Sequence, residues 1–262
     1  MEIIVLSDPA AVGRHAARLI ADTLARRRDP VLGVATGSSP LGTYAALAAL
    51  AREGLDLSRT TAFALDEYVG LDPSHPEAYH SVIDREVTLP LGLDPRKVHV
   101  PHGAAADLSA ACAEYEAAIE AAGGIDVQLL GIGANGHIGF NEPGSSLGSR
   151  TRVKTLAPRT RRDNARFFGG DVEAVPVHCL TQGIGTILRA RSVLLVATGE
   201  AKAAAVAAMA EGPLGAFCPA SALQLHERAT VVLDEAAASK LVDREYYDFA
   251  RDHAPEAAPG LD

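Results

Sequence analysis

The sequence predicts an α/β protein with a mainly parallel sheet flanked by helices, organised as a single domain. Short β-rich runs alternate with Ala- and Leu-rich helical patterns along almost the whole chain, which is typical of βαβ units. At 262 residues, 48% of them hydrophobic, the chain can bury a large core, and α/β folds of this size commonly form one domain. Glycine-rich segments follow several of the β-rich runs, where a parallel sheet binds its ligands.

Seven runs have the apolar and β-branched content of buried strands. We expect strands at 3–6, 31–35, 61–65, 98–100, 127–130, 193–197 and 230–233. Between them, 10–26 and 108–122 have apolar positions three and four apart, so each helix should lay one face on the sheet.

Two stretches interrupt the alternation. Residues 139–152 are rich in glycine and serine, and 73–76 begins and ends with proline. Irregular segments of this kind carry functional loops on a rigid scaffold. The composition of 253–262 predicts a flexible tail at the end of the domain expected over 1–262.

The bulk composition excludes several classes of function. A formal net charge of −9 argues against a nucleic-acid partner, and no segment approaches the roughly 18 apolar residues of a membrane helix. The first thirty residues contain no targeting signal, and the three cysteines are widely spaced without a C-x-x-C motif. We therefore expect a cytoplasmic protein without a zinc cluster, a disulfide framework or a membrane partner.

One local exception to the acidic charge lies in 150–166. Its cations are opposed only by Asp163, and they are Arg150, Arg152, Lys154, Arg159, Arg161, Arg162 and Arg166. The cluster fits either a site for a small anion or a solvated basic loop.

The segment 131–143, GIGANGHIGFNEP, contains four glycines together with His137 and Glu142, directly after an expected strand. Gly131, Gly133 and Gly136 match the dinucleotide fingerprint G-x-G-x-x-G. That fingerprint needs a helix at its third glycine and an acidic residue about 20 positions later, and neither follows here. We interpret the segment as a loop that presents an imidazole and a carboxylate.

The second expected strand leads into ATGSSPLGTY, residues 35–44. Thr36, Gly37, Ser38 and Ser39 precede Pro40 at a helix start. Glycine allows close backbone approach, and free amides at a helix N-terminus favour a phosphate. The alternative is an ordinary strand-to-helix turn with a serine cap.

Two further positions carry charge at the same edge of the sheet. Asp66 and Glu67 end the third strand, where they could reach the pocket or could cap the segment that follows, in which 75–81 opens a helix. Lys202 falls in the first turn of a helix, where a cation is unfavourable unless an anion lies between it and the amides. An ordinary surface lysine is the alternative reading.

Taken in order, several segments resemble the glucosamine-6-phosphate deaminases across nearly the whole chain. They are TGSSP, LDEYVGL, GIGANGHIGFNEPGSSLGSRTRVKTL, DNARFF, the segment at Lys202 and SALQLH. The resemblance implies a Rossmann-like three-layer fold and the conversion of glucosamine 6-phosphate and water to fructose 6-phosphate and ammonia. It also implies no cofactor and no metal, because the aldehyde of the opened sugar is its own electron sink.

The resemblance also implies roles for individual residues. Asp66 is similar to the base that moves the proton between C2 and C1, His137 to the ring-opening acid and Glu142 to the carboxylate that orients it. Some members have aspartate where this chain has Asn135, and an amide supplies no negative charge to a protonated imidazole, so the relay is expected to depend on Glu142. The residues similar to the family's phosphate-binding positions are Thr36, Gly37, Ser38, Ser39, Arg166 and Lys202.

Some members are hexamers activated by N-acetylglucosamine 6-phosphate, and others are monomers. The residues that resemble the effector site of the hexamers are Ser145, Arg152, Lys154 and Tyr246. The sequence leaves both oligomeric states open, with a sugar phosphate as the expected partner.

Three other functions compete with the deaminase interpretation. A 6-phosphogluconolactonase shares the phosphate and histidine loops but transfers no carbon-bound proton, and a non-catalytic sugar-phosphate sensor needs no acid–base pair. A nicotinamide oxidoreductase would need the fingerprint that the glycine loop lacks. The Asp66 segment and FNEP favour the deaminase.

Overall fold

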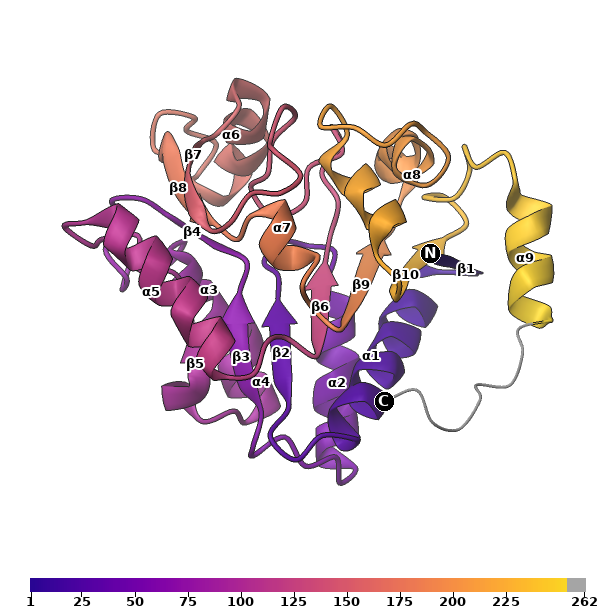
Figure 1. Ribbon diagram of the computed structural model, residues 1–262, viewed down its shortest axis with the longest axis horizontal. Coiled ribbons are helices and arrows are strands. Elements are labelled where there is room, and N and C mark those ends of the chain that lie inside the picture. The colour runs from indigo at the N-terminus through magenta and orange to yellow at the C-terminus, as the bar shows by residue number, and fades with distance from the viewer. Residues whose placement is uncertain (254–262) are drawn as a thin grey trace.

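The computed structural model describes residues 1–253, which fold around a seven-stranded sheet (Figure 1). Its strand order is β1-β10-β9-β6-β2-β3-β5, and every neighbouring pair is parallel. The strands are β1 (Glu2–Leu6), β2 (Val31–Val34), β3 (Thr61–Ala64), β5 (Val98–His99), β6 (Val127–Leu130), β9 (Ser192–Ala197) and β10 (Ala229–Asp234). These are the seven runs predicted as strands, with ends that differ by one residue.

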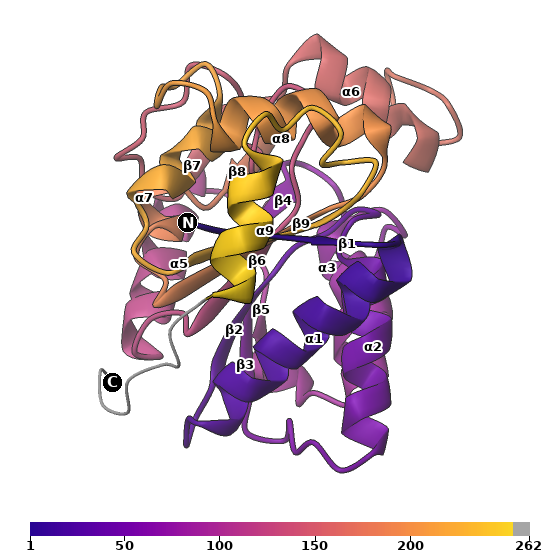
Figure 2. The ribbon, with the colours of Figure 1, turned by 90° about the vertical axis from the view of Figure 1, so that its right-hand side faces the viewer.

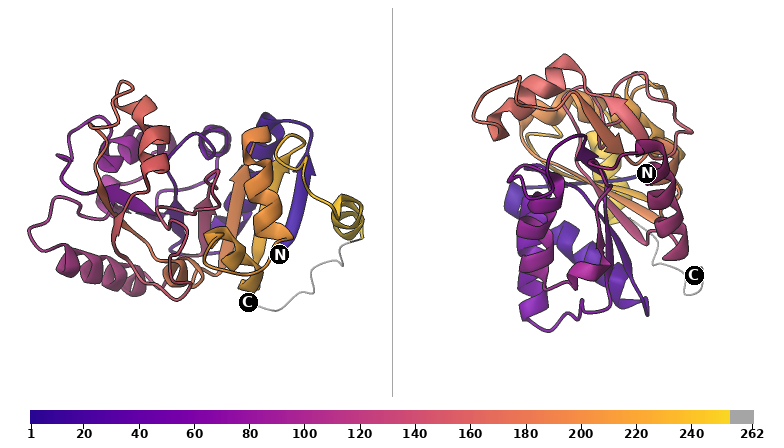
Figure 3. Two further views of the ribbon diagram at one scale, coloured as in Figure 1. Left: turned by 90° about the horizontal axis from the view of Figure 1, so that it is seen from above. Right: turned by 90° about the vertical axis from the view of Figure 1, so that its left-hand side faces the viewer.

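Helices cover both faces of this sheet, so the predicted three-layer α/β architecture is confirmed (Figures 2 and 3). One face carries α1 (Pro9–Ala25), α2 (Leu41–Arg52), α3 (Tyr79–Ile83) and α4 (Leu89–Leu91). The other carries α5 (Leu108–Ala121), α7 (Ile184–Ile187) and α8 (Ala203–Ala210). Alternate residues of β9 point into the two resulting cores, which explains its unbroken apolar sequence.

A second, smaller sheet was not predicted. It is antiparallel, has the order β4-β8-β7, and consists of β4 (Asp66–Tyr68), β8 (His178–Thr181) and β7 (Arg152–Thr155). Only Leu65 separates β4 from β3, so the two strands read as a single run. The small sheet and α6 (Pro158–Asn164) lie above the carboxyl ends of β2, β3 and β6 (Figure 1). The basic segment is therefore a strand and a helix rather than a loop, and none of its seven cations is fully buried.

Short helical turns and a last helix complete the described chain. The turns are η1 (Asp84–Thr88), η2 (Pro95–Lys97), η3 (Ala165–Phe167), η4 (Glu200–Lys202) and η5 (Pro219–Leu225). The last helix, α9 (Arg244–Asp252), stands beside the edge strand β1 (Figure 2). Apart from His253, the tail expected at 253–262 lies outside the described residues. Within the described part, no helix combines the length and apolar character needed to span a membrane.

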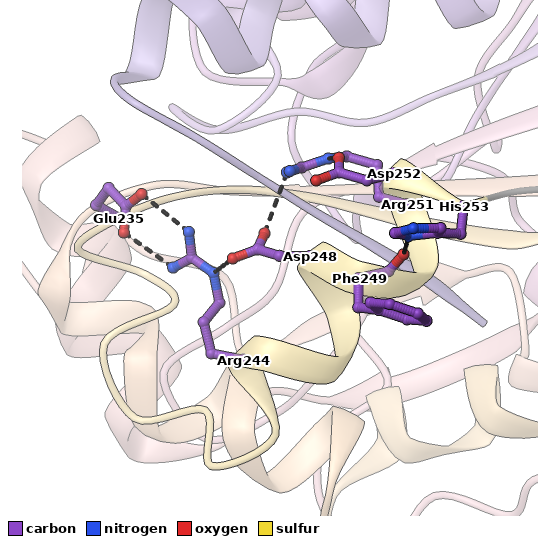
Figure 4. Close-up of polar contacts among 7 residues, drawn as sticks. All are labelled: Glu235, Arg244, Asp248, Phe249, Arg251, Asp252 and His253. Atoms are coloured by element: carbon purple, nitrogen blue, oxygen red, sulfur yellow. Dashed lines mark hydrogen bonds and ion pairs between the residues drawn. The ribbon is translucent and has the colours of Figure 1, made fainter.

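Ion pairs hold α9 in place. Arg244 donates to both carboxylate oxygens of Glu235 at 2.9 and 3.0 Å and to Asp248 at 2.9 Å (Figure 4). Arg251 donates to the other oxygen of Asp248 at 3.1 Å. Asp248 and Arg251 belong to α9 itself, so of these contacts the Arg244–Glu235 pair joins the helix to the rest of the protein, together with the packing of Tyr247 on the core.

The helices α1 and α2 approach each other closely at two glycines. A methyl group on Gly13 would lie 2.7 Å from the backbone carbonyl of Gly42, whereas a methyl group on Gly42 would meet its nearest neighbour at 3.9 Å. Only the first of these positions therefore requires glycine for packing.

We predict that Gly13→Ala lowers the free energy of unfolding by about 1–3 kcal/mol, because the added methyl group forces the two helices apart. Its matched control, Gly42→Ala, should leave that free energy unchanged or raise it by up to about 1 kcal/mol, because alanine reduces the entropy of the unfolded chain. Urea denaturation measures both values. Equal destabilisation by the two substitutions would contradict this account of the helix contact.

Candidate functional site

A cavity of about 360 Å³ opens at the carboxyl ends of β2, β3 and β6, below α6 and η3. Eight of the residues predicted for the active site line it: Thr36, Gly37, Ser38, Ser39, Asp66, His137, Arg166 and Lys202. They come from five separate segments of the chain. The parallel sheet brings them together because each segment follows or covers the carboxyl end of a strand.

The loop between β2 and α2 forms one wall of the cavity. Pro40 is the N-cap of α2, no side chain caps the helix, and the serine-cap alternative is therefore wrong. Gly37 has a φ of 93°, a conformation that L side chains rarely adopt. Tyr44 fixes the loop from behind, since its hydroxyl donates to the carbonyl of Ala35 and accepts from the N–H of the same residue. The hydroxyl of Thr36 has Tyr79 as a hydrogen-bond partner, and Ser38 and Ser39 line the cavity beside it.

Asp66 forms part of the cavity wall as the first residue of β4, and its side chain is only 4% exposed. Burial, and then the negative charge of Glu67, raise its pKa well above the ordinary value, against a smaller opposing effect of the Phe140 N–H. A carboxyl group with a raised pKa in a cavity is typical of a catalytic acid or base.

Glu67 behaves differently from its neighbour. It accepts hydrogen bonds from the N–H groups of Tyr79 and His80 at 2.8 Å, so it caps α3, as the capping alternative predicted. The helix expected within 75–81 thus begins at Tyr79.

His137 lies on the loop that follows β6. A methyl group on Gly133 would lie 2.2–2.4 Å from three atoms of the imidazole, so glycine at this position leaves room for the ring. No helix begins at Gly136, because residues 131–151 contain no helical segment. The dinucleotide interpretation is therefore wrong. Gly133 thus makes room for the histidine, whereas a methyl group on Gly136 would meet Cys218 instead.

Glu142 lies behind His137 and is 5% exposed. Its Oε2 is 3.7 Å from Nδ1 of His137 and accepts from Nδ2 of Asn135 at 2.9 Å. Its Oε1 accepts from the hydroxyl of Thr160 and, at 3.3 Å, from the N–H of Ala157. Burial raises the pKa of Glu142, but His137 and the hydroxyl of Thr160 outweigh burial and hold the pKa at about 2. The carboxylate therefore stays charged beside the imidazole.

Asn135 makes hydrogen bonds to both His137 and Glu142. Its Oδ1 accepts from the backbone N–H of His137 at 3.2 Å while its amide donates to Glu142. The amide thus positions the loop and the carboxylate. Its hydrogen bonds in the described structure go to the backbone of His137 and to Glu142, and not to the imidazole ring.

The cationic end of the cavity contains Lys202 and Arg166. Lys202 is the last residue of η4 and the N-cap of α8, one position before the helix turn in which it was expected. Its Nζ donates to the carbonyl of Ile132 at 2.7 Å, and burial, followed by the charge of Arg166, lowers its pKa. The guanidinium of Arg166 lies 4.6 Å from the ring centre of Phe167. Two neighbouring cations with a lowered lysine pKa are typical of an anion site.

The other cations of the basic segment do not enter the cavity. Arg150 pairs with Glu116 and Glu120, Arg159 with Asp163, and Arg161 donates to two backbone carbonyls. Of the seven, only Arg166 lines the cavity.

The four residues that resemble an effector site do not come together within one chain. Ser145 is buried, Arg152 and Lys154 lie on β7, and Tyr246 is 65% exposed on α9. β7 and α9 lie at opposite ends of the molecule (Figure 1). Arg152 instead donates to Oδ1 of Asn141 at 2.9 Å, and burial lowers its pKa.

The sequence analysis missed several residues of the cavity wall. They include Glu77, Tyr79, Arg85, Phe140, Thr160, Asn164 and Phe167. A signal was available for Tyr79, because a capping carboxylate at Glu67 implies a helix start nearby. No sequence pattern marks Thr160, whose contact with Glu142 spans 18 positions. Among residues 1–253, no three His, Cys, Asp or Glu side chains are arranged to hold a metal ion.

Residues 9–232 match the family model of glucosamine-6-phosphate isomerases and 6-phosphogluconolactonases. A glucosamine-6-phosphate deaminase of Streptomyces coelicolor is 58% identical over 98% of both chains, and one of Cutibacterium acnes is 60% identical over 94% of this chain and 95% of its own.

Solved structures agree with these matches. A structure described as a monomeric glucosamine-6-phosphate deaminase is 43% identical, with a TM-score of 0.89 over 92% of this chain and 100% of its own. A 6-phosphogluconolactonase from Trypanosoma cruzi shares the fold at 20% identity, with a TM-score of 0.74 over 92% of this chain and 97% of its own. The chain belongs to the family of glucosamine-6-phosphate isomerases and 6-phosphogluconolactonases.

Proposed function

We propose that the protein catalyses the isomerising deamination of glucosamine 6-phosphate with water to fructose 6-phosphate and ammonia, in amino-sugar catabolism in the cytoplasm. The observation that carries the proposal is the buried carboxyl group of Asp66 in the same cavity as His137 and the cations Arg166 and Lys202. Relatives named as deaminases, at 58% and 60% identity, support the substrate.

The phosphate of the substrate is bound at the cationic end of the cavity. Arg166 and Lys202 supply charge, and the β2–α2 loop supplies backbone N–H groups and the hydroxyls of Ser38 and Ser39, with Thr36 beside them. Binding at this remote group holds the sugar still, and such positioning contributes about 7–11 kcal/mol in favourable cases. The sugar carbons then extend toward Asp66 and His137.

Ring opening precedes the proton transfer. His137 donates a proton to the ring oxygen while the bond between that oxygen and C1 breaks, and the C1 hydroxyl returns a proton to the imidazole, which gives the open aldehyde. Glu142, charged and 3.7 Å from Nδ1, stabilises the protonated imidazole and orients the other ring nitrogen toward the cavity. Asn135 holds both partners in place.

Asp66 then carries out the isomerisation. Its carboxylate removes the proton from C2, and the electron pair moves through the new C1–C2 double bond onto the carbonyl oxygen. The oxygen at C1 takes up a proton from solvent, which gives an enolamine. The lone pair of the amine then forms a double bond to C2 while Asp66 returns its proton to C1, and water hydrolyses the resulting imine to the ketone and ammonia. A raised pKa makes the carboxylate a stronger base, which suits a carbon acid better than an ordinary aspartate does.

The oligomeric state belongs to the same proposal. The deaminase structure at 43% identity is described as monomeric. We therefore propose that the protein works as a monomer, without the effector control of hexameric relatives.

We predict that the protein, without added metal or cofactor, releases one ammonia for each fructose 6-phosphate formed from glucosamine 6-phosphate. Coupled assays measure the two products separately. Hydrolysis of 6-phosphogluconolactone without ammonia release would favour the lactonase, and tight binding without turnover would favour a sensor.

Asp66→Asn should lower the exchange of the C2 proton with deuterated solvent by about 10²–10⁴-fold, because an amide cannot accept the proton. Inhibition by inorganic phosphate should be retained, which shows that the cavity is intact. Glu114→Gln, an exposed carboxylate on α5, is the control and should exchange normally. Undiminished exchange in Asp66→Asn would remove this residue from the mechanism.

Arg166→Gln and Lys202→Gln should each weaken inhibition by inorganic phosphate by about tenfold or more, equivalent to about 1.4 kcal/mol. KM should rise by a similar factor. The matched control is Arg162→Gln, since Arg162 is an exposed cation of α6 outside the cavity wall and should leave both quantities unchanged. Equal effects of all three substitutions would indicate a general influence of net charge.

A further inference from the structure

Glu67, the acidic residue next to Asp66, is a buried carboxylate that accepts hydrogen bonds from backbone N–H groups. Glu67 is 5% exposed and accepts three backbone hydrogen bonds, each 2.8 Å long. Oε1 accepts from the N–H groups of Tyr68 and Tyr79, and Oε2 accepts from that of His80. Hydrogen bonds of this kind favour the charged form, and they oppose the effect of burial, which raises the pKa of Glu67.

Glu67 and Asp66 are consecutive in β4, so their side chains project to opposite faces of the strand. Asp66 lines the cavity, whereas Glu67 does not. The medium between them is protein interior, in which charges interact more strongly than in water. Glu67 can therefore act on Asp66 without touching the substrate.

Other titratable groups face the same carboxyl group, and all of them are neutral near pH 7. They are Tyr68, Tyr79, Tyr115 and Cys179, and burial raises the pKa of each. The imidazole of His80 faces Glu67 rather than Asp66. Among the described residues, Glu67 is thus the group that places a negative charge on Asp66.

The carboxylate of Glu67 also anchors part of the cavity wall. Tyr79, whose N–H it binds, begins α3 and lines the cavity. The ring of Tyr79 is stacked on Phe140 at 5.7 Å between ring centres, and Phe140 also lines the cavity. Loss of the carboxylate would therefore change both the charge on Asp66 and the anchoring of this wall.

We propose that Glu67 is a positioning residue of the reaction, whose carboxylate is held by three backbone N–H groups so that its charge strengthens Asp66 as the base at C2. The inference rests on the proposed function, because it assigns Glu67 a part in the proton transfer. An ionised Asp66 beside a second buried carboxylate is less stable, so it takes up a proton more readily. Glu67 gains no proton and binds no atom of the sugar.

The test is the pH dependence of kcat/KM for Glu67→Gln, whose acid limb reports the pKa of the base in the free enzyme. Removal of the charge should move this limb to lower pH and should lower kcat by about threefold to tenfold, since the base becomes weaker. The KM should stay within about twofold. A solely structural role would reduce the yield or the stability of the protein without moving the limb.

Glu67→Asp is the matched variant, because it keeps the charge and shortens the reach to the amides of α3. Its acid limb should stay where the native protein has it, even if the thermal stability falls. An unmoved limb in Glu67→Gln, or limbs displaced equally in both variants, would overturn the inference. If Glu67→Gln does not fold, Glu67→Asn takes its place, since it differs from Glu67→Asp in charge and hardly in size: a limb at lower pH in Glu67→Asn than in Glu67→Asp supports the inference, and equal limbs overturn it. Failure of the proposed function is distinguishable, because the native protein would then release no ammonia.

Discussion

The site depends on one physical constraint, which is that a carboxyl group must line a polar cavity while being almost completely excluded from water. Asp66 meets it as the first residue of β4, a strand of the small antiparallel sheet. Burial raises its pKa, although the cations Arg166 and Lys202 line the same cavity. The pairing of β4 with β8 holds the carboxyl group in this buried position.

The two acid–base groups are given opposite electrostatic surroundings by the same fold. Glu142 receives hydrogen bonds from Asn135 and Thr160 and lies beside an imidazole, so its pKa falls to about 2. Asp66 has a neighbouring negative charge and little hydrogen bonding, so its pKa rises. Groups whose surroundings push their pKa values apart are typical of acid–base sites. One carboxylate can therefore support a proton donor while the other accepts a proton from carbon.

The main sheet and much of the site were predictable from the sequence, because their signals are local. Most of the seven strands are rich in apolar residues, and seven of the eight predicted residues that line the cavity follow strand ends that a parallel sheet gathers at one edge. The small sheet was not predictable in this way. β7 alternates polar and apolar residues amid arginines, and its partner β8 lies some 25 positions later. Nor does spacing reveal that Thr160 donates to Glu142, or that Tyr246 lies away from Arg152, since both depend on how distant segments pack.

The central claim is that Asp66 is a strengthened base because it is buried beside a second carboxylate. The most direct test is a pH titration of its carboxyl ¹³C chemical shift, assigned by the signal that disappears in Asp66→Asn. The account predicts a midpoint well above the value of about 3.9 that is usual for aspartate. A midpoint at or below that value would contradict it, whatever the activity of the protein.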